Sequence, residues 1–208
     1  MKKIKLLVII ALVFIMMLSF TGCGEIKKAE TVINNTFTAL KSLDFETASD
    51  YINVDEIMNS EDEENDALSL DDNVFMENLF GKLEYEIVSS EKIDKNTVVA
   101  KTKITAVDMK PVLGEFLGKS LQYALANVFS NPQPSDEEMN QMMEEMFVEC
   151  VSKEDLAMVT TEVDIKVIKV DKKWKIESAD ELSDALLGGL TKATEEISNS
   201  LDSVNNSF

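Results

Sequence analysis

The spacing of apolar residues along the chain changes between the three- or four-residue steps of a helix and the two-residue steps of a strand, and this change most constrains the fold. Apolar and polar residues alternate over 83–106 around the turn residues 94–96, which predicts a β-hairpin. A second hairpin is predicted over 159–176, with its turn at 171–173. Between the two hairpins, residues 110–150 show helical spacing. The sequence therefore predicts a helical hairpin inserted between two strand pairs.

Helical spacing also precedes and follows the strands. The first predicted helix spans 25–40 and has Ile26, Ala29, Ile33, Phe37 and Leu40 on one face. The others are a short helix capped by Asp44, helices over 74–80 and 111–129, a helix that begins with a Ser135/Glu138 capping box, and a C-terminal helix bent at Gly188-Gly189. This order predicts an α+β fold in which N-terminal helices pack on a curved antiparallel sheet.

The first residues have the organisation of an export signal. Lysines at the start are followed by an apolar run from Leu6 to Phe20, which is short for a membrane span. The segment Leu18-Ser19-Phe20-Thr21-Gly22-Cys23 resembles a lipobox, although Phe20 stands where Leu is usual. This resemblance implies cleavage before Cys23, diacylation of its thiol, and anchoring at the outer face of the cell membrane. The alternatives are an uncleaved signal anchor and an ordinary secretory signal.

The predicted organisation is therefore a signal peptide over 1–22, a lipidated anchor and short linker over 23–25, one α+β domain over 26–203 and a frayed tail over 204–208. With Cys23 acylated, Cys150 is the remaining cysteine, so no disulfide is expected within the mature chain. Cys150 lies on the apolar side of a helical pattern and is predicted to be a buried small hydrophobe.

The charge balance limits the partners. The net charge is −19, and loss of residues 1–22 removes three lysines and no acids. Such a domain repels nucleic acid, so nucleic-acid binding is excluded as its main function. Repulsion from anionic headgroups is also expected to hold the folded part away from the membrane.

Residues 55–72 are rich in acids and poor in apolar residues, which predicts an exposed loop. Clustered carboxylates also suit calcium. The spacing differs from an EF-hand loop, because counting from Asp62 places Ala67 where Gly is needed and Asn73 where Glu is needed. Cation binding stays open as an alternative, and no metal site is predicted.

Two segments carry a resemblance to a known fold. Residues 39–48, Ala-Leu-Lys-Ser-Leu-Asp-Phe-Glu-Thr-Ala, and residues 170–176, Val-Asp-Lys-Lys-Trp-Lys-Ile, together with the element order, resemble the cystatin-like cone of nuclear transport factor 2. The chain is similar to lipoproteins of unknown function from Gram-positive bacteria that carry this fold. The resemblance covers about residues 26–178. It implies a cone that the 110–150 insertion either closes or leaves open.

The residue types available restrict catalysis. The sequence contains neither histidine nor arginine, so histidine bases, histidine metal sites and arginine phosphate clamps are unavailable. No catalytic motif is present, and we expect a non-catalytic protein without a cofactor. A cone-pocket isomerase or hydrolase that uses a carboxylate and Tyr51, Tyr85 or Tyr123 is the enzymatic alternative. A purely structural envelope protein is another.

Binding is the class of function that the sequence favours, either of a protein partner or of a small apolar ligand at the cell envelope. Candidates for lining a pocket fall on apolar faces, although each also fits an ordinary core position: Phe37, Phe45, Tyr51, Tyr85 and Trp174. Methionines at helical spacing form a candidate partner surface, with the core as the alternative: Met139, Met142, Met143 and Met146.

Overall fold

The computed structural model describes residues 23–58, 73–130 and 132–205. The predicted signal peptide, most of the acidic segment and residues 206–208 lie outside the described residues. The elements are α2 (Cys23–Lys41), α3 (Phe45–Ser49), α4 (Val54–Met58), α5 (Asn73–Gly81), β1 (Glu84–Lys92), β2 (Thr97–Val107), α6 (Met109–Asn127), α7 (Asp136–Val151), β3 (Met158–Val170), β4 (Lys173–Ile176), α8 (Asp180–Leu186) and α9 (Leu190–Asn205).

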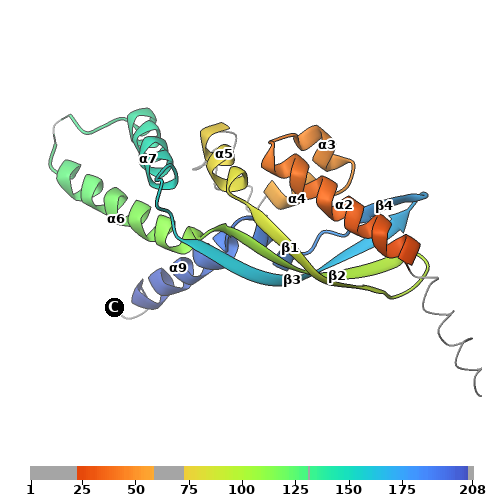
Figure 1. The fold of residues 1–208 in the computed structure, drawn as a ribbon. Helices are drawn as coiled ribbons and strands as arrows, with labels where there is room; N and C mark the ends of the chain where they lie inside the picture. The colour runs from red at the N-terminus through yellow and green to blue at the C-terminus, as the bar shows by residue number, and fades with distance from the viewer. Residues whose placement is uncertain (1–22, 59–72, 131, 206–208) are drawn as a thin grey trace, which may run out of the picture.

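The four strands form one antiparallel sheet in the order β1-β2-β3-β4, and the sheet is curved and unclosed (Figure 1). Alternation in β2 sends Val98, Ala100, Thr102, Ile104 and Ala106 to the buried face. Helix α2 lies across that face and contacts all four strands. The predicted α+β class, with N-terminal helices on a curved antiparallel sheet, is therefore confirmed.

The opposite face of the sheet is polar. Lys101 on β2 pairs with Glu162 and Asp164 on β3 at 3.3 and 3.5 Å, and the hydroxyls of Thr105 and Thr160 are 2.7 Å apart. Half-exposed ion pairs of this kind contribute little to stability. The buried side chains accordingly form one hydrophobic cluster between the sheet and the helices.

Side-chain hydrogen bonds cap the first turns of several helices, two of them as predicted. The Asp44 side chain accepts a hydrogen bond from the Thr47 backbone N–H, and Ser135 and Glu138 form a capping box. Helix α6 begins earlier than predicted, because the Asp108 side chain accepts from the Lys110 N–H. Pro111 fits within the first turn, where a backbone N–H has no helical partner.

The two glycines between α8 and α9 form a Schellman cap. Gly189 N–H donates to the Asp184 carbonyl at 2.8 Å and Gly188 N–H to Ala185 at 3.3 Å, with positive φ at both glycines. The Gly188 carbonyl accepts a hydrogen bond from Met109 N–H at 3.0 Å. This contact attaches the α8–α9 turn to the start of α6.

Two predicted boundaries are wrong. The acidic loop expected over 55–72 begins inside helix α4, because Val54 and Ile57 bury on the same side of one helical turn. The tail expected from residue 204 overlaps the end of α9, which continues through Asn205. The predicted helical hairpin over 110–150 corresponds to α6 and α7, which project from one end of the sheet (Figure 1).

Candidate partner-binding surface

Helix α6 has one face packed and one face bare. Its packed face meets α7, where the Phe116 and Phe147 rings make an edge-to-face contact with centroids 5.3 Å apart. Lys119 pairs with Glu149 at 2.9 Å across the same interface. Hydrogen bonding to Glu149 raises the pKa of Lys119, so this lysine remains charged.

The bare face is apolar. Leu117, Leu121 and Leu125 recur every four residues and form a row that turns progressively away from Phe116 along the helix. Leu121 is 62% exposed and Leu125 is 64% exposed, and Phe129, just beyond the helix, is 92% exposed. We call Leu117, Leu121, Leu125, Val128 and Phe129 the α6 stripe.

The stripe continues a row that starts in the core. Leu113, one turn before Leu117, is buried, and Lys110 pairs with Glu196 of α9 at 2.6 Å near the start of the helix. Helix α9 therefore contacts the base of α6, whereas the distal half of α6 extends beyond the core (Figure 1). Contiguous exposed apolar surface of this kind is typical of an interaction site.

The charges around the stripe are distinctive. The sequence from Ser120 to Ser130 carries no charged residue. The neighbouring helices are acidic and exposed, with Glu144 and Glu145 on α7 and Glu195 and Glu196 on α9. The stripe is thus an uncharged apolar row on a helix whose two packing partners, α7 and α9, carry exposed acids.

The methionines predicted as a partner surface are less available than the α6 stripe. Met139, Met142, Met143 and Met146 are all half-buried on α7. Met142 lies beside Tyr123 in a hollow of about 460 Å³ near the α6–α7 connection. Cys150 on the same helix is buried, as predicted, and this burial raises the pKa of its thiol.

The five candidate pocket residues lie in or against the core. Phe37 is buried and stacks on Tyr85 with ring centroids 4.3 Å apart, and Phe45 contacts Phe80 edge-on at 5.9 Å. Trp174 is 9% exposed, and Tyr51 packs against the core. This burial fits the alternative in which these side chains are ordinary core residues.

The tyrosine hydroxyls are bound to amides. Tyr85 Oη donates to Asn34 Oδ1 at 2.8 Å, and Tyr51 Oη accepts from Asn35 Nδ2 at 3.1 Å. Partial burial raises the pKa of Tyr85, so its phenol stays protonated at neutral pH. In the described residues, neither phenol forms the tyrosine–carboxylate pair that the enzymatic alternative requires.

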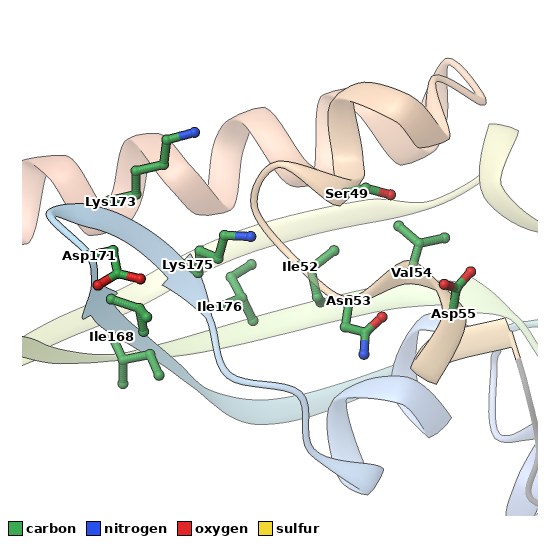
Figure 2. A pocket seen from close by; sticks show the side chains of 11 residues that line it. Ser49, Ile52, Asn53, Val54, Asp55, Ile168, Asp171, Lys173, Lys175 and Ile176 are labelled. Atoms are coloured by element: carbon green, nitrogen blue, oxygen red, sulfur yellow. The ribbon is translucent and has the colours of Figure 1, made fainter.

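A second surface feature lies at the β4 edge of the sheet. A hollow of about 530 Å³, the β4 hollow, is open to solvent between the 49–55 segment and the β3–β4 hairpin. Ile52, Ile168 and Ile176 contribute apolar surface, and Lys175 extends toward the 49–55 segment (Figure 2). None of the five predicted pocket residues lines it.

Two negative findings apply to the described residues alone. None of their helices has the length and apolar character needed to cross a membrane. They also contain no group of three or more acidic or cysteine side chains placed to hold a metal ion. Cys23 is the first residue of α2, and its side chain lies outside the described part. The short linker expected over 23–25 is therefore wrong, because these residues form the first turn of α2.

No family model and no curated protein matches the chain. A solved structure, the "putative lipoprotein" YcdA of Bacillus subtilis, matches with 21% identity and a TM-score of 0.41. The match covers 54% of this chain and 35% of that one, so this chain spans about a third of the length of YcdA.

Proposed function

We propose that this protein is a lipoprotein of the cell envelope, anchored through Cys23, with a non-catalytic domain that binds a protein partner through the α6 stripe. The observation that carries the binding proposal is the exposure of Leu121, Leu125 and Phe129 on a helix that extends beyond its own core. Placing the domain in the cystatin-like fold is part of the same proposal. The support for this placement is the resemblance of 39–48 and 170–176 to that fold.

The anchoring proposal is supported by the lipobox resemblance at 18–23. Metabolic labelling with a radioactive fatty acid tests it. We expect label on the wild-type protein and none on the Cys23→Ser variant. Equal labelling of the two would place the lipid elsewhere and refute the assignment.

The shape of the stripe suggests the kind of partner. Leucines at i, i+4 and i+8 are the anchors by which an amphipathic helix occupies an apolar groove. Because the helices that pack against α6 carry exposed acids, among them Glu144, Glu145 and Glu195, a groove with basic residues at its rim suits this end of the molecule.

Two other occupants fit less well. A second copy of this chain would bring two domains of the same strong negative charge together. A lipid surface is disfavoured because α6 projects from the end of the sheet opposite to the start of α2 (Figure 1). A protein partner with a basic-rimmed groove is therefore the occupant that we propose.

Photo-crosslinking in living cells tests this proposal. A photoreactive amino acid at Leu125 should give one discrete adduct, and the same group at Lys103, on the polar sheet face, should not. The adduct should disappear in a Leu121→Ser background whose circular dichroism is unchanged, and it should weaken as salt is raised. An adduct with the mass of two copies of this chain, or identical adducts from both positions, would refute the proposal.

The β4 hollow supports a second candidate function, binding of a small amphiphile. Its volume lies within the usual range of ligand sites, roughly 300–1,000 Å³, and Lys173 and Lys175 stand beside its isoleucines. Dodecyl phosphate is a suitable probe. Saturable binding that is lost in an Asn53→Trp variant, but not in Leu125→Trp, would support this function, because Asn53 lines the hollow and is exposed. Equal binding by both variants would reject it.

A further inference from the structure

The lysines of this acidic protein are distributed unevenly. The end of the sheet that carries the two hairpin turns also carries the start of α2 (Figure 1). Glu25 in the first turn of α2 pairs with Lys92 at the end of β1 at 3.3 Å. Lys169 N–H donates to the Asn96 carbonyl at 2.8 Å, which joins the two hairpins. These contacts place Cys23 and both turns at one end of the molecule.

We call this the basic end. Its lysines lie on the first turns of α2 and in the two hairpins: Lys27, Lys28, Lys92, Lys95, Lys169, Lys172, Lys173 and Lys175. They outnumber the acids there, which are Glu25, Glu30, Glu91, Asp94 and Asp171. The local charge is therefore opposite in sign to that of the whole chain.

These lysines are also largely unneutralised. Apart from Lys92, none of them forms an ion pair with another described residue. At the opposite end, Lys110, Lys119, Lys153 and Lys192 on or beside the helices α6, α7 and α9 are all paired with carboxylates. Among the described lysines, those without an ion pair are thus most numerous at the end where α2 begins; Lys41, Lys82 and Lys103 are the unpaired ones elsewhere.

We infer that the basic end docks on the anionic lipid surface of the membrane that holds Cys23, and so fixes the orientation of the domain. This inference rests on the proposed lipid anchor. Because α2 begins at Cys23 and rises about 1.5 Å per residue, Lys28 lies only about 7 Å along the helix from the lipid site. At 0.1 M salt the Debye length is about 10 Å, so these charges fall within reach of the headgroups.

The inference reverses the expectation from net charge. The total of −19 predicts repulsion from headgroups at long range. At short range the nearest charges dominate because salt screens the distant ones. The acidic helices α7 and α9 then point away from the membrane, which removes their repulsion and presents the α6 stripe outward.

The single tryptophan provides a native probe of docking. Trp174 lies on β4 beside the lysines of the hairpin. The acylated mature protein is reconstituted in vesicles that carry a dansyl group on their outer headgroups. We expect energy transfer from Trp174 to be higher with phosphatidylglycerol present than with phosphatidylcholine alone. The difference should be lost at about 1 M salt, where the Debye length is about 3 Å.

Matched charge reversals complete the test. Lys95→Glu with Lys172→Glu changes the two turns of the basic end, whereas Lys41→Glu with Lys103→Glu makes the same change in net charge elsewhere. Only the first pair should lower energy transfer to the phosphatidylcholine value. Equal transfer in both vesicle types, or equal loss in both variants, overturns the inference. Vesicle flotation reports the anchor separately, because an acylated chain floats with both vesicle types whether or not it docks.

Discussion

Gly188→Ala should destabilise the protein far more than Gly189→Ala. Both glycines have positive φ, at 63° and 78°, so alanine at either position carries the left-handed cost of about 1–2 kcal/mol. A Cβ on Gly188 would stand 1.7 Å from the Val107 carbonyl oxygen, whereas a Cβ on Gly189 has nothing within 4 Å. The obstruction is backbone, so no side-chain rotation relieves it.

Relief of this clash requires the turn to move away from β2. That movement breaks the hydrogen bond from Met109 N–H to the Gly188 carbonyl, which is worth about 1 kcal/mol, in addition to the loss of packing. We expect a cost of about 3 kcal/mol or more for Gly188→Ala and about 1 kcal/mol for Gly189→Ala.

Urea denaturation followed by circular dichroism measures the difference. With an m value of about 2 kcal/mol/M, the two midpoints should differ by about 1 M at unchanged slope. Equal midpoints for the two variants would refute the argument, since both carry the cost of positive φ and only Gly188→Ala adds the clash with Val107. The result also bears on function, because this turn holds the start of α6.

Three further predictions follow from the same structure. Leu113→Ala should cost about 2 kcal/mol or more because its side chain is buried, whereas Leu121→Ala should lie within about 0.5 kcal/mol of wild type by urea denaturation. The hydrogen bond that Lys92 donates to the Glu25 carboxylate holds the pKa of Glu25 below its ordinary value. The stabilisation from this ion pair is therefore full above the unfolded pKa of about 4.3 and is lost as pH falls through the folded pKa of Glu25. Lys92→Gln should therefore lower stability at neutral pH and have no effect at the acid end, as measured by urea midpoints across pH; a pH-independent difference would contradict the ion-pair assignment. In the acylated protein, Cys150 should react with a thiol reagent slowly when folded and rapidly in urea, because burial raises its pKa; equal rates would show that the thiol is accessible.

The spacing of apolar residues predicted the helices and strands because a spacing of two fits a strand and a spacing of three or four fits a helix. The alternation in 99–106 appears as the alternating burial of β2, and the bend predicted at Gly188-Gly189 is the Schellman cap. Helix α4 was missed because its apolar residues are only Val54, Ile57 and Met58, next to a segment dominated by acids. One helical turn is too short for its period to stand out from composition.

The partner surface could not be assigned from the sequence for a different reason. The methionines of α7 and the leucines of α6 both recur at helical spacing. This spacing shows which residues share a face of a helix, but it does not show whether another element packs on that face. Helix α6 spans 19 residues, or about 28 Å, and extends past the core that buries Leu113. The absence of charge from Ser120 to Ser130 was the available signal, because a helix exposed on all but one side normally carries charges there.

The two proposals constrain each other through the geometry of the sheet. The basic end and the α6 stripe lie at opposite ends of one curved sheet, with a continuous core between them (Figure 1). If the lysines of the basic end orient the domain, then their reversal leaves the stripe intact but removes its fixed presentation away from the membrane. Lys95→Glu with Lys172→Glu should therefore weaken the Leu125 adduct in cells through loss of orientation, while Lys41→Glu with Lys103→Glu should not. An adduct unaffected by the first pair would mean that the anchor alone suffices for partner binding, whatever the orientation of the domain.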